Sequence, residues 1–182
     1  RARRVWGTGR TWPTRGARAL GEVRGGIGWR GRTSSPNRDR IAQLVERITL
    51  VDGDRLDEGS MVQLLAAHRP TEVYNLAAQS FVAMSWNQPV LTGEITGLGV
   101  SRMLAAIRQE NPEIRFYRQT SSHMCGNVRD PPQYEDAPLP TRTPYCRAIA
   151  YGPSLTSHHR PRPSPSPPLA LSSLAPSPTP RA

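Results

Sequence analysis

The apolar positions between residues 40 and 152 change their spacing several times along the chain. Some segments are short apolar runs, which favour strands, and others repeat apolar residues every three or four positions, which favours helices. The pattern predicts three strands and two helices, in the order strand Ile48–Val51, helix Glu58–His68, strand Glu72–Ala77, helix Leu91–Gln109 and strand Glu113–Tyr117.

Strands and helices that alternate at this spacing are typical of βαβ units and of a parallel sheet. We therefore predict an α/β fold with an incomplete Rossmann-like, doubly wound parallel sheet and disordered ends. The strand that ends at Ala77 runs into small and polar residues. Because ligands of such sheets lie at the carboxyl ends of the strands, this strand end is the first candidate for a binding site.

Composition divides the chain into three segments. Residues 1–39 are rich in Arg and Gly and are expected to be poorly ordered, with a degraded first βα unit. Residues 40–152 form the predicted core. Residues 153–182 contain nine prolines, which lack an amide donor, so a disordered tail is expected. Both flanks use residues of GC-rich codons, which favours the hypothesis of out-of-frame translation, or of a mispredicted gene start and end, around a genuine core. The lack of an initial Met suggests a fragment.

The formal net charge of +10 is concentrated at the ends of the chain. The first 40 residues carry +9 and the last 30 carry +3, whereas residues 41–152 carry −2. A nearly neutral core argues against nucleic acid as a partner. No apolar run approaches about 20 residues, which argues against a membrane span. Cys125 and Cys146 have neither metal-site nor disulfide spacing, so we expect no metal and a reduced, cytoplasmic setting.

Several motifs occur in one order through the predicted core. They are Gly53-Asp54, Pro70–Ser80, Arg115-Phe116-Tyr117, Gly126–Arg129, Thr143-Pro144-Tyr145 and Ala150-Tyr151-Gly152. From about Arg30 to Gly152 this ordered set resembles the GDP-mannose 4,6-dehydratases, a family of extended short-chain dehydrogenases/reductases. The Ala77–Ser80 and Gly126–Arg129 segments favour this branch over the epimerases and other dehydratases of the same superfamily, which share the fold.

The resemblance implies an internal redox cycle on a nucleotide sugar. In the family a bound NADP takes hydride from C4 of the sugar, water is eliminated across C5 and C6, and the hydride returns to C6. The tyrosine of a Tyr-x-x-x-Lys pair is the base on the sugar hydroxyl, a Ser or Thr binds the oxygen at C4, and a Glu two positions after it removes the C5 proton.

On this pattern the candidate catalytic residues are Ser121, His123 and Tyr145. His123 stands at the Glu position, and a neutral imidazole can serve as a base near pH 7; a surface or packing histidine is the alternative. Ile149 replaces the Lys, which removes the cation that lowers the pKa of the tyrosine and holds the nicotinamide ribose. Arg147 is two residues away and on a helix points to another face.

The resemblance also implies positions that bind NADP. Arg32 and Ser34 stand where guanidinium groups meet the 2′-phosphate of NADP. Asp54 and Arg55 stand at an Asp-Leu adenine contact and match it at the first residue only. The cofactor-lining run is matched in full, by Leu76, Ala77, Ala78, Gln79 and Ser80. The glycine-rich phosphate loop is represented only by Gly7-Thr8-Gly9, which is a weak match.

The predicted function is that of a GDP-mannose 4,6-dehydratase-like lyase of GDP-fucose biosynthesis, impaired or inactive in this chain because two catalytic positions are altered. Its implied substrate is GDP-mannose, its cofactor NADP, and its assembly a homo-oligomer as in the family. The alternative is a non-catalytic binding protein on a truncated Rossmann core with basic and Pro-rich arms, in which Arg160–Pro163 is a candidate ligand for an SH3-type domain.

Overall fold

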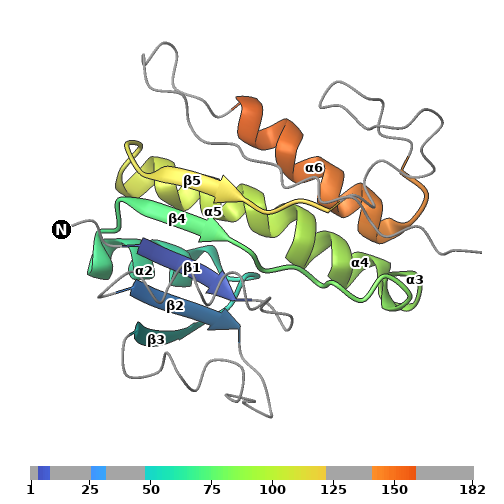
Figure 1. Cartoon of the computed structure of the whole chain (residues 1–182), viewed down its shortest axis with the longest axis horizontal. Coiled ribbons are helices and arrows are strands. Elements are labelled where there is room, and N and C mark those ends of the chain that lie inside the picture. The colour runs from blue at the N-terminus through green and yellow to red at the C-terminus, as the bar shows by residue number, and fades with distance from the viewer. Residues whose placement is uncertain (1–3, 9–25, 32–47, 122–140, 159–182) are drawn as a thin grey trace, which may run out of the picture.

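The strands of the computed structural model form one parallel sheet. The structure describes residues 4–8, 26–31, 48–121 and 141–158. The sheet order is β3-β2-β1-β4-β5, and every neighbouring pair is parallel (Figure 1). The strands are β1 (Arg4–Thr8), β2 (Gly26–Gly31), β3 (Ile48–Gly53), β4 (Glu72–Asn75) and β5 (Arg115–Arg118). This is the order of the first five strands of a Rossmann fold, and it places the carboxyl ends of all five strands at one edge.

Six helical elements lie in the described ranges. They are α2 (Glu58–His68), α3 (Met84–Asn87), α4 (Pro89–Thr92), η2 (Gly93–Leu98), α5 (Gly99–Glu110) and α6 (Pro144–His158). Helix α2 ends where Arg69 takes the left-handed conformation, with φ of 42°, and donates its N–H to the Leu65 carbonyl at 2.8 Å. Pro70 then prevents the helix from continuing.

The segment from α4 to α5 is one continuous helix with a π-helical middle, η2. Pro89 occupies its first turn, where the missing amide hydrogen costs nothing. By length and composition this 22-residue helix could cross a membrane, with a mean hydropathy of 1.3 over its most apolar 18 residues, but half of that window is buried inside the fold. A helix packed in a protein core can pass the same test of length and hydropathy.

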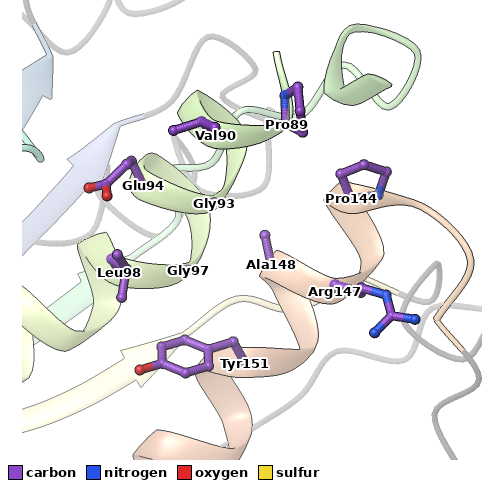
Figure 2. A pocket seen from close by; sticks show the side chains of 10 residues that line it. All are labelled: Pro89, Val90, Gly93, Glu94, Gly97, Leu98, Pro144, Arg147, Ala148 and Tyr151. Atoms are coloured by element: carbon purple, nitrogen blue, oxygen red, sulfur yellow. The ribbon is translucent and has the colours of Figure 1, made fainter. Parts of the chain in front are cut away.

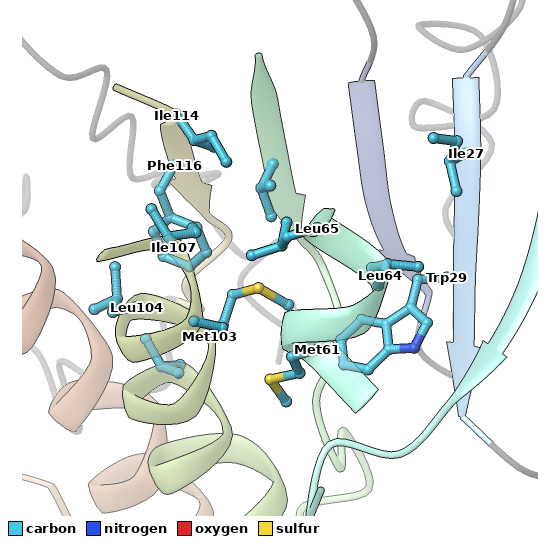
Figure 3. Close-up of a cluster of buried hydrophobic side chains, with 13 residues drawn as sticks. Ile27, Trp29, Met61, Leu64, Leu65, Met103, Leu104, Ile107, Ile114 and Phe116 are labelled. Atoms are coloured by element: carbon cyan, nitrogen blue, oxygen red, sulfur yellow. The ribbon is translucent and has the colours of Figure 1, made fainter. Parts of the chain in front are cut away.

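The main hydrophobic core lies between one face of the sheet and the helices α2 and α5 (Figure 3). Met61 and Leu65 of α2 meet Met103 of α5 there, and all three side chains are almost completely buried. Ile27 and Trp29 enter the core from β2, and Phe116 enters it from β5. The apolar face that the spacing of α2 predicts, including Leu64, is therefore confirmed.

The predicted central elements are confirmed, but the sheet starts earlier than residue 40. Strands β1 and β2 lie inside the N-terminal segment that was expected to be poorly ordered, and β1 is the central strand. In β2 only Ile27 and Trp29 mark the buried face, and Gly28 fits because an added Cβ would lie 2.8 Å from Leu50 Cδ2. Two apolar residues among glycines are too few to show the period of a strand. The other residues of segment 1–39 lie outside the described ranges.

The predicted end of the core at Gly152 is also corrected. Helix α6 runs through Pro153 to His158, although a proline was expected to stop it. Proline removes one amide donor, but the preceding turns already hold the chain in helical geometry. Thr156 Oγ1 donates to the Gly152 carbonyl at 2.8 Å within this last part of the helix. The expected disordered tail after His158 lies outside the described residues.

Substitution of Gly53 on β3 can test how tightly β2 packs against β3. A Cβ at Gly53 would lie 1.8 Å from Trp29 Nε1, whereas one at Gly31, its register partner on β2, would meet no atom within 4 Å. Gly53→Ala is expected to lower the free energy of unfolding by about 1–3 kcal/mol because the Trp29 ring must move. Gly31→Ala should change it by less than about 0.5 kcal/mol. Urea unfolding followed by circular dichroism measures both, and equal effects would contradict this packing.

Candidate active site

The ends of β4 and β5 lie side by side and carry the chain into the candidate site. Asn75 pairs with Arg118 in the sheet, and the Gln119 amide continues the pairing by donating to the Asn75 carbonyl at 3.1 Å. Beyond these pairs, β4 runs into Leu76–Ser80 and β5 runs into Ser121. The parallel register therefore brings the predicted cofactor-lining run next to one of the predicted catalytic residues.

Tyr145 is held in the first turn of α6. The Thr143 hydroxyl accepts the Cys146 amide at 3.0 Å and the Thr143 carbonyl accepts the Arg147 amide at 3.1 Å, which is the role of a helix N-cap. The Tyr145 side chain is buried, with 6% of its surface exposed, and packs in a cluster with Cys146 and Ile149. Its position is thus set by the start of the helix.

The structure brings Ser121 and Tyr145 together. Burial raises the pKa of Tyr145, while a side-chain hydrogen bond with Ser121 and the positive charge of Arg118 act in the opposite direction, and the neighbouring Cys146 thiol adds to the rise. A serine hydroxyl hydrogen-bonded to a tyrosine phenol orients that phenol. Tyr145 and Ser121 thus form the centre of the candidate site.

Ile149, which lies one turn after Tyr145 on α6, is an apolar residue in apolar surroundings. Ile149 is 2% exposed and packs with Tyr145, Ala78 and Val82. Arg147, which Figure 2 shows on α6, is exposed and lies outside this cluster, and a helical residue two positions after Tyr145 is expected on a different face. Helix α6 itself therefore supplies no cation to the inner side of Tyr145.

The segment after β4 presents its backbone and small side chains. Ala77 is buried and Ala78 packs against the Tyr145 cluster. The Gln79 amide donates to Thr96 Oγ1 at 3.0 Å and its side chain donates to the Phe81 carbonyl at 3.2 Å. Gln79 Oε1 is buried without a hydrogen-bond partner. A buried acceptor beside two alanines fits a cofactor that supplies a donor there, so this run fits the dinucleotide that the sequence predicts.

Asp54 and Arg55 differ in what they do. The Asp54 carboxylate accepts the Leu56 amide at 2.9 Å and shapes the turn before α2. The Arg55 side chain turns inward, donates to the Ala77 carbonyl and is 7% exposed. Burial, and then the charge of Arg118, lower the pKa of Arg55 to about 9. Its guanidinium thus contacts the backbone of the cofactor-lining run from the protein interior and does not face solvent.

Arg118 is the site residue that the sequence analysis missed. It is 5% exposed and lies on the same face of β5 as the core residue Phe116. Burial is the main cause that lowers its pKa, to about 10, so it remains a cation at neutral pH. An arginine two positions after a buried Phe, on the apolar face of a strand, was the signal that could have identified it.

The remaining candidates cannot be placed. Arg32, Ser34 and His123 lie outside the described residues, as does Gly9 of the weak phosphate-loop match. Gly7 and Thr8 belong to the end of β1, at the same edge of the sheet as Ala77.

A separate groove of about 450 Å³ lies between the α4–η2 segment and α6 (Figure 2). Val90 and Leu98 line one side, and Ala148 and Tyr151 line the other. It lies on the outer face of the helix pair, and neither Ser121 nor Tyr145 is among its lining residues.

Solved structures of known proteins share this fold. UDP-glucose 4-epimerase from Brucella ovis in complex with NAD superposes with a TM-score of 0.75 at 17% identity, covering 87% of this chain and 48% of that one. The dTDP-glucose 4,6-dehydratase of Streptomyces venezuelae, solved with NAD bound, superposes with a TM-score of 0.74 at 20% identity, covering 86% of this chain and 51% of that one. The fold is thus that of the Rossmann-type epimerases and dehydratases.

Sequence comparison defines the family within this class. The profile of the GDP-mannose 4,6 dehydratase family matches residues 22–162, and the chain belongs to this family. The GDP-mannose 4,6 dehydratase of Drosophila melanogaster is 41% identical over 108 residues, covering 58% of this chain and 27% of that protein. The Yersinia enterocolitica GDP-mannose 4,6-dehydratase is 34% identical over 142 residues, covering 73% of this chain and 38% of that protein. The chain thus spans well under half the length of these relatives.

The buried phenol of Tyr145 gives a pH dependence of stability. Because its pKa is higher in the folded chain than the ordinary value of 10.0, the folded state keeps the proton longer than the unfolded state. The stability that this proton contributes is present below about pH 10 and is lost as the pH rises through the folded pKa. The free energy of unfolding should therefore fall more steeply between about pH 9 and 11 in the unchanged chain than in Tyr145→Phe.

The matched control for this measurement is Tyr151→Phe, which alters a tyrosine on the exposed side of the same helix. Its stability should keep the steep dependence of the unchanged chain. Parallel curves for the unchanged chain and Tyr145→Phe would show that Tyr145 is not buried as described.

Proposed function

We propose that the chain is an NADP-dependent GDP-mannose 4,6-dehydratase of reduced turnover. The observation that carries this proposal is the contact between Ser121 and Tyr145 beside the Ala77–Ser80 run, in a chain of this family. In this assignment Tyr145 takes the proton of the sugar hydroxyl, and Ser121 binds the same oxygen and holds the phenol in line. The bound NADP supplies the hydride acceptor and donor.

The described residues of the site fit a dinucleotide on the sheet edge. Ala77 and Ala78 have small side chains, and Gln79 Oε1 is buried with no hydrogen-bond partner among the described residues, so it could accept a donor from a bound cofactor. The carboxyl edge of a parallel sheet is where such cofactors bind. Relatives of the same fold have been solved with NAD, which supports a nicotinamide cofactor, and the family's Arg-x-Ser pattern at Arg32 and Ser34 favours NADP.

The reduced turnover follows from two positions. Ile149 leaves the helix without the lysine that the resemblance implies, and His123 replaces the Glu that removes the C5 proton. Loss of one member of a cooperating catalytic set commonly lowers kcat by orders of magnitude. The preserved Ser–Tyr contact is the reason that we assign residual activity instead of none.

Product formation tests this assignment. The unchanged chain, incubated with GDP-mannose and NADP, is expected to form the dehydrated 4-keto-6-deoxy sugar nucleotide slowly, which mass spectrometry detects as the loss of one water. Tyr145→Phe and Ser121→Ala should each remove that product because they delete the base and its hydrogen-bond partner. Tyr151→Phe, on the exposed side of α6, should leave the rate unchanged. A product that persists in Tyr145→Phe would contradict the assignment.

Cofactor binding is tested separately by thermal unfolding. NADP that binds the folded chain raises the unfolding midpoint, by RT ln(1 + [L]/Kd) in free energy. We expect NADP to raise the midpoint of both the unchanged chain and Tyr145→Phe, because the cofactor-lining run is intact in both. The absence of any rise at millimolar NADP would contradict the proposed cofactor.

A further inference from the structure

Arg118 lies between the sheet and α6 at the level of the candidate site. Side chains alternate along β5, so Phe116 and Arg118 share the face that the helices cover, while Arg115 and Tyr117 share the other face. Arg115 pairs there with Glu72, and the Tyr117 ring packs on Tyr74 with centroids 5.6 Å apart. Arg118 is thus separated by the sheet from the ion pair that Arg115 forms.

Two backbone carbonyls and one glycine hold the guanidinium of Arg118 in place. Its Nη2 donates to the Thr96 carbonyl at 2.8 Å, and its Nη1 lies 3.5 Å from the Ala77 carbonyl. A Cβ at Gly152 would approach its Nε to 3.2 Å, so α6 passes directly over the side chain. Thr96 belongs to the π-helical segment η2, and such segments are frequent at functional sites.

The positive charge of Arg118 has no carboxylate partner among the described residues. Its Nε is buried without a hydrogen-bond acceptor, and the charged group beside it is another arginine, Arg55. A buried cation is normally paired, because the low dielectric makes an unpaired charge costly. No carboxylate of the described residues therefore neutralises the field of Arg118, which acts on groups near it that can become negative.

Tyr145 packs on Ala78, the residue after the Ala77 whose carbonyl Arg118 contacts, so the phenol shares the surroundings of this cation. The titratable and charged groups that act on Tyr145 are Arg118 from β5 and Cys146 from its own helix, and Ser121 is its polar hydrogen-bond partner. Its apolar neighbours in the described residues include Ile149 and Ala150 of α6 and Ala78 and Val82 of the segment after β4. Arg55 is not among the groups that act on Tyr145, but the charge of Arg118 lowers the pKa of Arg55.

We propose that Arg118 is the positioning residue for Tyr145 and supplies, from the sheet, the cation that Ile149 does not supply from the helix. The inference rests on the proposed function for its catalytic meaning, but its physical content is the coupling between one guanidinium and one phenol. That coupling exists whether or not the chain turns over GDP-mannose.

The ionisation of Tyr145 in the full chain measures this coupling. Ultraviolet absorbance of tyrosinate is followed against pH, and the curve of each Tyr145→Phe counterpart is subtracted, which isolates Tyr145. Arg118→Gln keeps donors for the Thr96 and Ala77 carbonyls but removes the charge, so the Tyr145 midpoint should move to higher pH by about one unit, a roughly tenfold smaller ionised fraction at a given pH. Arg118→Lys keeps the charge and should restore most of the shift.

Arg115→Gln is the matched control because it removes a cation from the same strand on the opposite face. It should leave the Tyr145 midpoint unchanged. An unchanged midpoint in Arg118→Gln, or an equal shift in Arg115→Gln, overturns the proposal. Failure of the titration and failure of the activity assay are distinguishable, since a chain without turnover can still show the coupled midpoint.

A second measurement needs no substitution at Arg118. In the unchanged chain labelled with nitrogen-15 arginine, the buried Arg118 Nε–H resonance should shift with the same midpoint as the Tyr145 absorbance. In Tyr145→Phe that shift should be absent. A resonance that does not respond across the Tyr145 transition overturns the proposal even if every Arg118 variant fails to fold.

Discussion

The parallel pairing of β4 with β5 determines where each described site residue lies. Asn75 is opposite Arg118, and the Gln119 amide adds one more bond to the Asn75 carbonyl beyond the last strand residues. A shift of one residue in this register would turn Arg118 and Phe116 to the opposite face of the sheet and remove Phe116 from the core. Because Phe116 fixes the register by its burial, it also fixes the side on which Arg118 emerges.

The Ala77 carbonyl connects the sheet to the helices above it. It lies just after β4, accepts from Arg55 and lies within 3.5 Å of Arg118, so two guanidinium groups converge on one backbone atom. Burial lowers the pKa of each, and the charge of Arg118 lowers that of Arg55 further. Such a pair disfavours folding at neutral pH, where both groups are charged. Perturbed ionisable groups gathered at a strand end are more typical of a functional site than of a stabilising network.

The sequence predicts the elements that carry long runs of pattern and misses those that depend on neighbours. Helix α2 has the predicted bounds Glu58–His68, and β4 and β5 lie where the pattern places them within about two residues. Strand β1 has five residues and obtains its stability from β2 on one side and β4 on the other, which no local pattern records. The core was expected to end at Gly152 because a Pro-rich tail follows, whereas α6 continues through Pro153 to His158.

The residues of the candidate site divide in the same way, into those that a motif predicts and those that depend on their neighbours in space. Ser121 and Tyr145 were predicted because the family motifs contain them, and their contact required the placement of α6 against β5. Arg118 belongs to no motif and was missed, since its role depends on the helix that covers it. Arg55 was placed by a motif that it matches poorly, and its side chain turns into the interior instead.

In the pattern of the family, one lysine both lowers the pKa of the tyrosine and holds the nicotinamide ribose. In this chain we propose that the cation for Tyr145 comes from the sheet, so the two roles are separated. A lysine at position 149 would stand on α6 one turn from the phenol, where it could meet both Tyr145 and the nicotinamide ribose. Arg118 reaches the phenol from the sheet and is held by the Ala77 and Thr96 carbonyls beneath the site. A guanidinium fixed there can favour the phenolate. Its two Nη atoms contact the carbonyls, and its Nε is buried against α6, 3.2 Å from a Cβ built at Gly152, so none of its donors is directed outward. Under the proposed function, Arg118 supplies a cation to the base while Ile149 supplies none to the ribose, so a lower cofactor affinity is expected together with the reduced turnover.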